Sequence, residues 1–145
     1  MRVVLDTNVL VASFRCATGA SRALLKDAFA RRFTMLASPT VFMEYEAVLK
    51  RKEHLKAAGA RLSDVDTLLN ALAIVIEPVE VSYLWRPQLK DPADEMVLEA
   101  AVNGQANWIV TFNMKHFYEA TMRFGITAKT PGEGLRTLRR MYEKK

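Results

Sequence analysis

Three acidic residues from distant parts of the chain, Asp6, Glu44 and Asp94, lie where a carboxylate can do chemistry. Asp6 directly follows the apolar run at residues 3–5, and the other two fall among the apolar positions of expected helices. Carboxylates brought within about 4 Å of each other repel by roughly 1 to 4 kcal/mol per pair. A cluster of them therefore needs a divalent cation, and oxygen ligands without a cysteine favour Mg²⁺ or Mn²⁺ over zinc.

The spacing around Glu44 and Asp94 distinguishes them from ordinary surface acids. Glu44 comes three residues after Val41, and Asp94 comes three residues before Val97. Each acid thus shares the apolar side of its helix, where an unpaired buried charge costs several kcal/mol. We expect such carboxylates either to be paired with a base or a metal ion, or to lie at the open rim of a pocket.

Each acid also has a purely structural interpretation. In that interpretation, Asp6 has no role beyond capping the helix that follows it. Asp94 then only stabilises the helix dipole, in a first turn that also contains Glu95, and this effect is worth about 0.3 to 1 kcal/mol. Asp91, which precedes Pro92, is expected to be the N-cap of that helix.

A fourth group of polar residues follows the apolar run at residues 108–110. Thr111, Asn113 and His116 come just after it, so their side chains are expected at the same edge of a parallel sheet as Asp6. A lone histidine beside an aromatic residue is more often a packed or surface residue than a metal ligand. His116 is therefore open to either interpretation.

Strands and helices alternate along the sequence. Short β-branched or apolar runs predict strands at residues 3–5, 33–37, 74–76 and 108–111, with a short edge strand at 126–128. Apolar spacing predicts helices at 21–30, from 39 to about 51, at 63–73 and at 92–102, and a basic helix from 131 onward. This alternation is typical of βαβ units with a parallel sheet covered on both faces.

Local signals place the ends of these elements. Ser38-Pro39 and Thr130-Pro131-Gly132-Glu133 match helix caps followed by proline, and Gly59 ends a basic, solvent-facing stretch. Pro78 and Pro87 indicate a loop before the helix that starts after Asp91. In open parallel sheets, ligands bind at the carboxyl ends of the strands where the strand order reverses, which makes Asp6 a candidate site residue.

Composition sets wider limits on the chain. Its 145 residues predict one domain, and its net charge of +5 favours a polyanionic partner, although an acidic protein would serve equally well. The single cysteine, Cys16, and the lack of zinc-type spacing indicate a reducing, cytoplasmic compartment. No apolar run is long enough to cross a membrane, and the first residues do not resemble a signal peptide.

Four motifs, in order, resemble those of the PIN-domain family, which includes the VapC-like ribonuclease toxins of toxin–antitoxin pairs. They are Val-Val-Leu-Asp-Thr-Asn at 3–8, Ser38-Pro39 followed by Glu44, Asp-Pro-Ala-Asp-Glu at 91–95, and Thr-Phe-Asn-Met-Lys-His-Phe at 111–117. The resemblance spans nearly the whole chain. It implies a single PIN-like domain over 1–145, a three-layer α/β/α sandwich with a parallel sheet of four to five strands. His116 departs from the pattern, because many members have an aspartate there.

The resemblance also implies a function, the metal-dependent hydrolysis of RNA. Asp6, Glu44 and Asp94 would be the catalytic and metal-binding residues, with Mg²⁺ or Mn²⁺ as the ion, and Glu44 would bind it or orient the attacking water. Supporting roles would pass to Asn8, Asp91, Glu95, Thr111, Asn113 and His116, and RNA contacts to Arg15 and Lys115. A small antitoxin and a second copy of the chain are the implied protein partners.

Two alternatives remain open at this point. A PIN-like module with reduced catalysis could bind RNA or a partner protein, because His116 weakens the fourth acidic position. A haloacid-dehalogenase-like phosphatase also places an aspartate after its first strand and uses Mg²⁺. That class normally needs a second aspartate two residues later, where this chain has Asn8.

Overall fold

A five-stranded parallel sheet forms the centre of the protein, in a computed structural model that describes residues 1–82, 89 and 91–143. The strand order is β3-β2-β1-β4-β5, and every neighbouring pair is parallel. The strands are β1 (Arg2–Leu5), β2 (Thr34–Ala37), β3 (Glu77–Pro78), β4 (Trp108–Val110) and β5 (Thr127–Lys129). The predicted parallel α/β class is confirmed, with the edge strand of the sequence analysis at β5.

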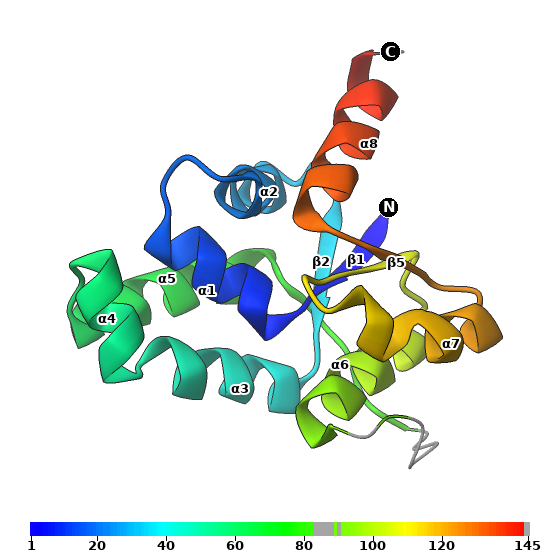
Figure 1. The fold of residues 1–145 in the computed structure, drawn as a ribbon, viewed down its shortest axis with the longest axis horizontal. Helices are drawn as coiled ribbons and strands as arrows, with labels where there is room; N and C mark the ends of the chain where they lie inside the picture. The colour runs from blue at the N-terminus through cyan, green and yellow to red at the C-terminus, as the bar shows by residue number, and fades with distance from the viewer. Residues whose placement is uncertain (83–88, 90, 144–145) are drawn as a thin grey trace.

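Helices fill the connections between the strands, and one more helix follows the last strand. They are α1 (Thr7–Arg15), α2 (Ala20–Phe29), α3 (Pro39–Leu49), α4 (Lys52–Ala58), α5 (Leu62–Val75), α6 (Pro92–Asn103), α7 (Met114–Phe124) and α8 (Pro131–Glu143). In Figure 1, α1 and α2 lie on one side of the strands, and α6 and α7 lie on the other. The three-layer α/β/α arrangement follows from this placement.

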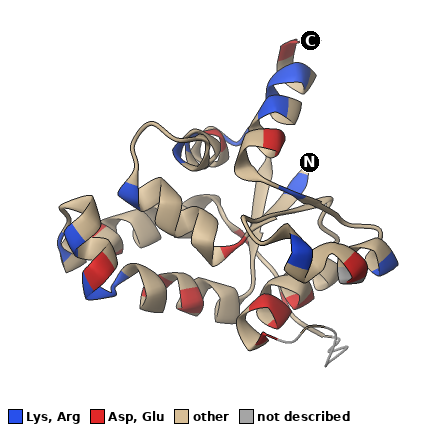
Figure 2. Cartoon of the chain, in the orientation of Figure 1, with Lys and Arg blue, Asp and Glu red and all other residues tan. Residues whose placement is uncertain are grey.

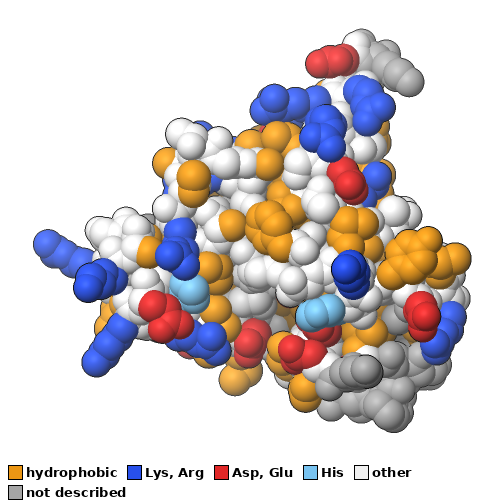
Figure 3. Space-filling view, viewed as in Figure 1, with side chains coloured by type: hydrophobic (Ala, Val, Ile, Leu, Met, Phe, Trp, Pro, Cys, Tyr) orange, Lys and Arg blue, Asp and Glu red, His pale blue; other side chains and the backbone are white. Residues whose placement is uncertain are grey.

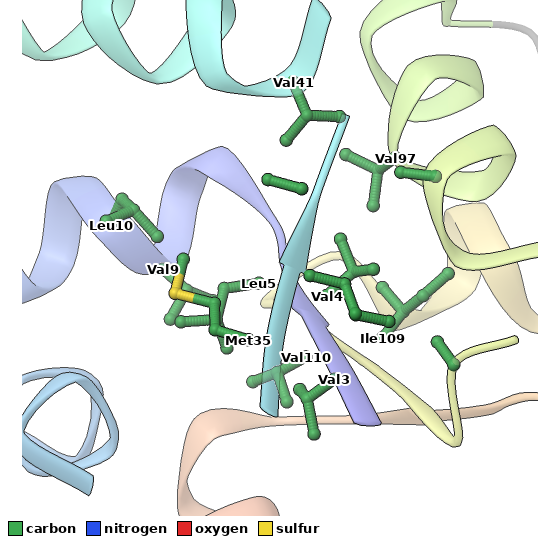
Figure 4. Packing of buried hydrophobic residues seen from close by; sticks show 14 of the residues in the cluster. Val3, Val4, Leu5, Val9, Leu10, Met35, Val41, Val97, Ile109 and Val110 are labelled. Carbon is green, nitrogen blue, oxygen red and sulfur yellow. The ribbon is translucent and has the colours of Figure 1, made fainter. Parts of the chain in front are cut away.

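The strands alternate their side chains between these two helical layers. Figure 4 shows Val3 and Leu5 directed toward the side of α1, whereas Val4 lies on the other side of β1 with Val97 of α6. Val3, Val4 and Leu5 are each at most 1% exposed. A strand covered on both faces must be apolar at every position, which explains why the sequence shows a continuous run there.

The strand order reverses between β1 and β4. The chain moves outward from β1 to β2 and β3, then returns through α6 to place β4 on the opposite side of β1. The backbone N–H of Asp6 donates to the carbonyl of Val110 at 2.9 Å, which joins the carboxyl ends of these two strands. The residues after β1 and after β4 therefore meet where a ligand crevice is expected.

The cap predictions are confirmed at three helices. The Ser38 hydroxyl accepts from Val41 N–H at the start of α3, and the Asp91 carboxylate accepts from Ala93 N–H at the start of α6. At α8, Thr130 and Glu133 exchange the two hydrogen bonds of a capping box.

The strand predicted at residues 74–76 is wrong. Ile74 and Val75 belong to α5, whose buried residues Val65, Leu69 and Leu72 follow helical spacing, and the N–H of Ile76 still donates to the carbonyl of Leu72. Their β-branched side chains were outweighed by this packing, since β propensity depends strongly on context. The strand at that edge is the shorter β3, which includes Pro78, and Pro87 lies outside the described residues.

Within the described residues, no helix is both long enough and apolar enough to cross a bilayer.

Candidate active site

A cleft of about 310 Å³ opens at the carboxyl edge of the sheet. The residues after β1 line it together with residues of α3, α4 and α6. Four acids reach it, namely Asp6, Glu44, Asp91 and Asp94, and two amides, Asn8 and Asn113. In Figure 2, acidic segments lie where β1 joins α1, along α3 and at the start of α6. The fold therefore brings the three distant acids of the sequence analysis to one cleft.

Asp6 is held by hydrogen bonds to both of its carboxylate oxygens. Oδ1 accepts from the N–H of Thr7 at 2.8 Å, and Oδ2 accepts from the hydroxyl of Thr111 at 2.7 Å. The Thr111 hydroxyl in turn accepts from the N–H of Asn113 at 2.9 Å. Asp6 is only 6% exposed, so this aspartate both caps α1 and presents a fixed carboxylate at the floor of the cleft.

Asp94 lies in the first turn of α6 and contacts a histidine from α7. Its Oδ2 is 2.9 Å from Nδ1 of His116. Asp94 is 6% exposed, whereas the His116 side chain is 52% exposed. The residue that departs from the family pattern is therefore a direct neighbour of a candidate metal ligand, although it does not line the cleft itself.

Both aspartates are destabilised as anions. Burial raises the pKa of Asp6, and the charge of Asp94 raises it further, while the hydrogen bonds from Thr111 and Thr7 partly offset the effect. Burial also raises the pKa of Asp94, the hydrogen bond with His116 lowers it, and the charge of Asp91 raises it. A cation bound between the two carboxylates would stabilise their charged forms.

The donors of this cleft fit a hard divalent ion. Glu44 is half-buried and lines the cleft. This placement agrees with the expectation that its carboxylate lies at the open rim of a pocket. Within residues 1–82, 89 and 91–143, no three acidic, histidine or cysteine side chains are already close enough to bind one ion directly. Mg²⁺ keeps several waters and is usually held by only one or two carboxylates, so Asp6 and Asp94 suffice for it.

Tyr45 connects α3 to the end of β1 beneath the candidate site residues, a role that the sequence analysis did not assign. Its side chain is fully buried, and its hydroxyl donates to the carbonyl of Leu5 at the end of β1. Burial and the charge of Asp6 both raise the pKa of Tyr45. The bond fixes α3, and with it the neighbouring Glu44, to the strand that carries Asp6. The only signal in the sequence was an aromatic residue next to the acid.

The other predicted site residues fall into two groups. Asn8 lines the cleft, and its Oδ1 accepts weakly from Phe112 N–H at 3.5 Å. Glu95 accepts from the N–H of Leu89 and does not line the cleft. Arg15 ends α1, roughly 12 Å along the helix axis from Thr7 at 1.5 Å per residue. Lys115 is exposed on α7 and, like Arg15, does not line the cleft.

Two basic residues of the cleft were not predicted as site residues. Arg51 and His54, at the start of α4, line the same cleft as the acids. In the sequence they belong to a run of bases that is equally typical of a solvated helix face. Their position depends on the turn between α3 and α4, which no local pattern specifies.

Comparison with known families decides the classification. A model of the PIN domain matches residues 2–115. The chain belongs to the PIN domain family. Among curated proteins, none matches this PIN domain by sequence. The haloacid-dehalogenase-like alternative is set aside, because the family match covers all four motifs of the sequence analysis except the last residues of the fourth.

A solved structure shares the fold of this PIN domain. It is the crystal structure of VapBC2 from Rickettsia felis bound to a DNA fragment from their promoter. The match has a TM-score of 0.60 and 16% sequence identity, and it covers 90% of this chain and 98% of the other. At this identity the likeness shows a common fold.

Proposed function

We propose that this PIN domain is an endoribonuclease that depends on Mg²⁺ or Mn²⁺. The observation that carries the proposal is the approach of Asp6 and Asp94, two buried carboxylates of raised pKa, within one open cleft. Buried acids are normally compensated by a buried basic partner, because uncompensated burial is costly. Here Asp6 has hydrogen bonds but no ion pair with a described residue, and Asp94 pairs with a half-exposed histidine. A cleft that keeps two such groups at its floor is suited to a bound divalent cation.

Each residue of the cleft has a proposed role. Asp6 and Asp94 hold the ion, and the Thr111 hydroxyl keeps Asp6 in position. When bound, such an ion polarises a phosphate and lowers the pKa of water. Glu44 at the rim binds the ion or orients the attacking water, and Asn8 and Asn113 offer amide groups to the substrate.

The remaining supporting residues act through their neighbours. Asp91 caps α6 and thereby positions Asp94, and His116 orients the Asp94 carboxylate. Glu95 fixes the segment before α6 through the N–H of Leu89. Lys115 and Arg15 remain proposed contacts for RNA outside the cleft, and the net charge of +5 favours such a polyanion.

We further propose that the protein is the toxin of a toxin–antitoxin pair and forms a homodimer. Support for an antitoxin comes from the neighbour in the solved structures, which is a VapBC2 assembly. A small protein encoded next to this one should relieve growth inhibition when both are expressed. Light scattering after gel filtration should give twice the mass of 16.4 kDa.

The decisive experiment measures cleavage of structured and unstructured RNA by the wild type and by Asp6→Asn. Mg²⁺, Mn²⁺ and a chelator are compared in parallel. We expect cleavage by the wild type that needs the ion and is lost with Asp6→Asn. Equal activity of the two proteins, or full activity in chelator, would contradict the proposal.

One observation favours a second candidate, a PIN domain that binds RNA without cutting it. His116 occupies one oxygen of Asp94 at the position where a further acid is common in the family. Under this alternative, the wild type binds RNA but releases no cleavage product with either ion. The same cleavage assay, run beside a binding assay, separates the two candidates.

A further inference from the structure

The cleft carries opposite charges at its two ends. Asp91 and Asp94 line it from α6, whereas Arg51 and His54 line it from the start of α4. Figure 3 shows basic side chains gathered over α4, beside acidic patches that lie over α3 and α6. A metal site explains the acidic end, but it gives no reason for a cationic wall facing the same space.

The bases near this wall are not equivalent. Lys50 is neutralised, because its Nζ lies 2.8 Å from Oδ1 of Asp66 and 3.5 Å from Oε2 of Glu46. Arg51 is the next residue, and it is exposed and has no ion pair with any described residue. The structure therefore uses Lys50 to join α3 to α5 and leaves the charge of Arg51 available to the cleft.

His54 has an unused polar edge in the same wall. Its Nδ1 atom is buried without a hydrogen-bond partner among the described residues. A proton on that atom would be a buried donor without a partner, which favours the ring tautomer with its N–H at Nε2. His54 can thus meet a ligand in the cleft through an N–H donor.

We propose that Arg51 and His54 form a subsite for a phosphodiester next to the one that is cleaved. This inference rests on the proposed ribonuclease function and extends it to the path of the RNA strand. Arginine presents a planar fork of donors that matches two phosphate oxygens, and an adjacent imidazole N–H adds a third bond. The strand would then run along the cleft from α6 toward α4.

The charge of the cleft supports such a subsite. Asp6, Glu44, Asp91 and Asp94 bring four carboxylates to the cleft, and one divalent ion neutralises only part of their charge. An RNA backbone entering this cleft needs cations at the wall, and the previously assigned Arg15 and Lys115 do not line it. Arg51 and His54 are basic side chains that do line it.

The binding test uses Asp6→Asn protein, so that no cleavage disturbs the equilibrium. A fluorescent single-stranded RNA oligonucleotide is titrated with this protein and with versions that add Arg51→Ala, His54→Ala or Lys52→Ala. Lys52→Ala is the matched control, because it removes one exposed charge from α4 without changing the cleft lining. Circular dichroism melts confirm that each variant is folded.

We expect Arg51→Ala to weaken RNA binding by about threefold to tenfold and to lower the slope of log affinity against log salt by about 0.7, as loss of one single-strand phosphate contact predicts. Arg51→Lys should keep that slope and lose less affinity, since it retains the charge without the fork. His54→Ala should weaken binding by about twofold to fivefold. Equal losses for Arg51→Ala and Lys52→Ala, or no loss for Arg51→Ala, would overturn the inference.

A second measurement separates this inference from the proposed function. In the otherwise wild-type enzyme, Arg51→Ala should raise KM and leave kcat nearly unchanged, because it removes binding common to substrate and transition state. Cleavage that is insensitive to Arg51→Ala at low substrate overturns the subsite and leaves the ribonuclease proposal standing. Selective loss of RNA binding with Arg51→Ala, in a protein that never cleaves, supports the subsite and overturns the ribonuclease.

Discussion

The charged residues at the two ends of strand β1 differ in how far their charge is compensated. At the start, the guanidinium of Arg2 donates to the carbonyl of Gly104 at 2.9 and 3.0 Å and pairs with Glu77. At the end, Asp6 is buried beside another acid, and its pKa is raised. The charge of Arg2 is paired at an edge that joins three segments of the fold, whereas Asp6 accepts two hydrogen bonds but has no basic partner among the described residues.

This contrast sets a structural charge against a candidate functional charge on the same strand. The bonds of Arg2 connect β1 with β3 and with the end of α6, so they stabilise the sheet. The bonds of Asp6 fix its orientation but do not remove its like-charged neighbour. Fixed, under-neutralised carboxylates in a cleft are typical of sites where an ion or a substrate completes the charge balance.

Substitutions at the two ends of β1 should affect different properties of the protein. The largest change is expected in RNA cleavage when Asp6 is replaced. Asp6→Asn should lower RNA cleavage by at least about 100-fold, equivalent to about 3 kcal/mol of transition-state stabilisation. It should leave folding intact, because asparagine caps helices as well as aspartate does and its amide can donate to the Thr111 hydroxyl. Cleavage assays and thermal melts on the same preparations measure both properties.

Arg2→Met is the matched substitution at the other end. It should lower the free energy of unfolding by about 1 to 2 kcal/mol, since the lost bonds involve a charged donor that is partly exposed. Activity per folded molecule should match the wild type. Two results would contradict these assignments. One is that Asp6→Asn unfolds the protein, and the other is that Arg2→Met abolishes cleavage although the protein is folded.

The pH dependence of stability should show that Asp6 is destabilised as an anion. In the folded protein the pKa of Asp6 is raised above 3.8, the value expected for the unfolded chain. In the pH range between these two pKa values, the folded protein keeps a proton on Asp6 that the unfolded chain has released. The free energy of unfolding of the metal-free protein therefore falls as pH rises through this range. The difference between wild type and Asp6→Asn, measured by urea unfolding at several pH values, isolates this contribution.

Added Mn²⁺ provides the control for that interpretation. At neutral pH it should raise the melting temperature of the wild type, because an ion that binds only the folded state stabilises it. The shift should be lost with Asp6→Asn. A similar shift in both proteins would place the ion elsewhere on the surface.

The smallest expected effect concerns the histidine that departs from the family pattern. His116→Asp should raise the affinity for Mn²⁺ by about tenfold, at the lower end of the roughly 10- to 100-fold changes typical of residues that adjoin metal ligands. The new carboxylate would stand beside Asp94 in place of the imidazole. Calorimetric titration with Mn²⁺ measures the affinity.

His116→Asn separates the two possible causes of that effect. It removes the imidazole from Asp94 without adding a negative charge. An increase with Asp and none with Asn supports a fourth acidic ligand. Equal affinities for wild type and His116→Asp would contradict the expectation.

Features of the fold that depend on local patterns were predictable from the sequence. The apolar run before Asp6, the caps at Ser38 and Asp91 and the capping box at Thr130 each have a short-range cause, and each is present. The strand at 74–76 failed because its residues extend a helix whose packing is set by α5 as a whole. Local β propensity could not report that packing.

The candidate site was predictable only in outline. The strand-end rule indicated that residues after β1 and β4 would meet, and Thr111 does bond Asp6. The pairing of His116 with Asp94 spans 22 residues and depends on how α7 packs beside α6. Arg51 and His54 reach the cleft through a turn between two helices, and helical periodicity does not give the angle of such a turn.

The bond between Thr111 and Asp6 joins positions 105 residues apart. During synthesis, β1 emerges from the ribosome first, but its neighbour β4 and the α6 aspartate emerge only after most of the chain has been made. A nascent or truncated chain that lacks β4 cannot assemble this pocket. Any activity of the candidate site therefore has to wait until the segment from α6 to Thr111 has been made and has folded against β1.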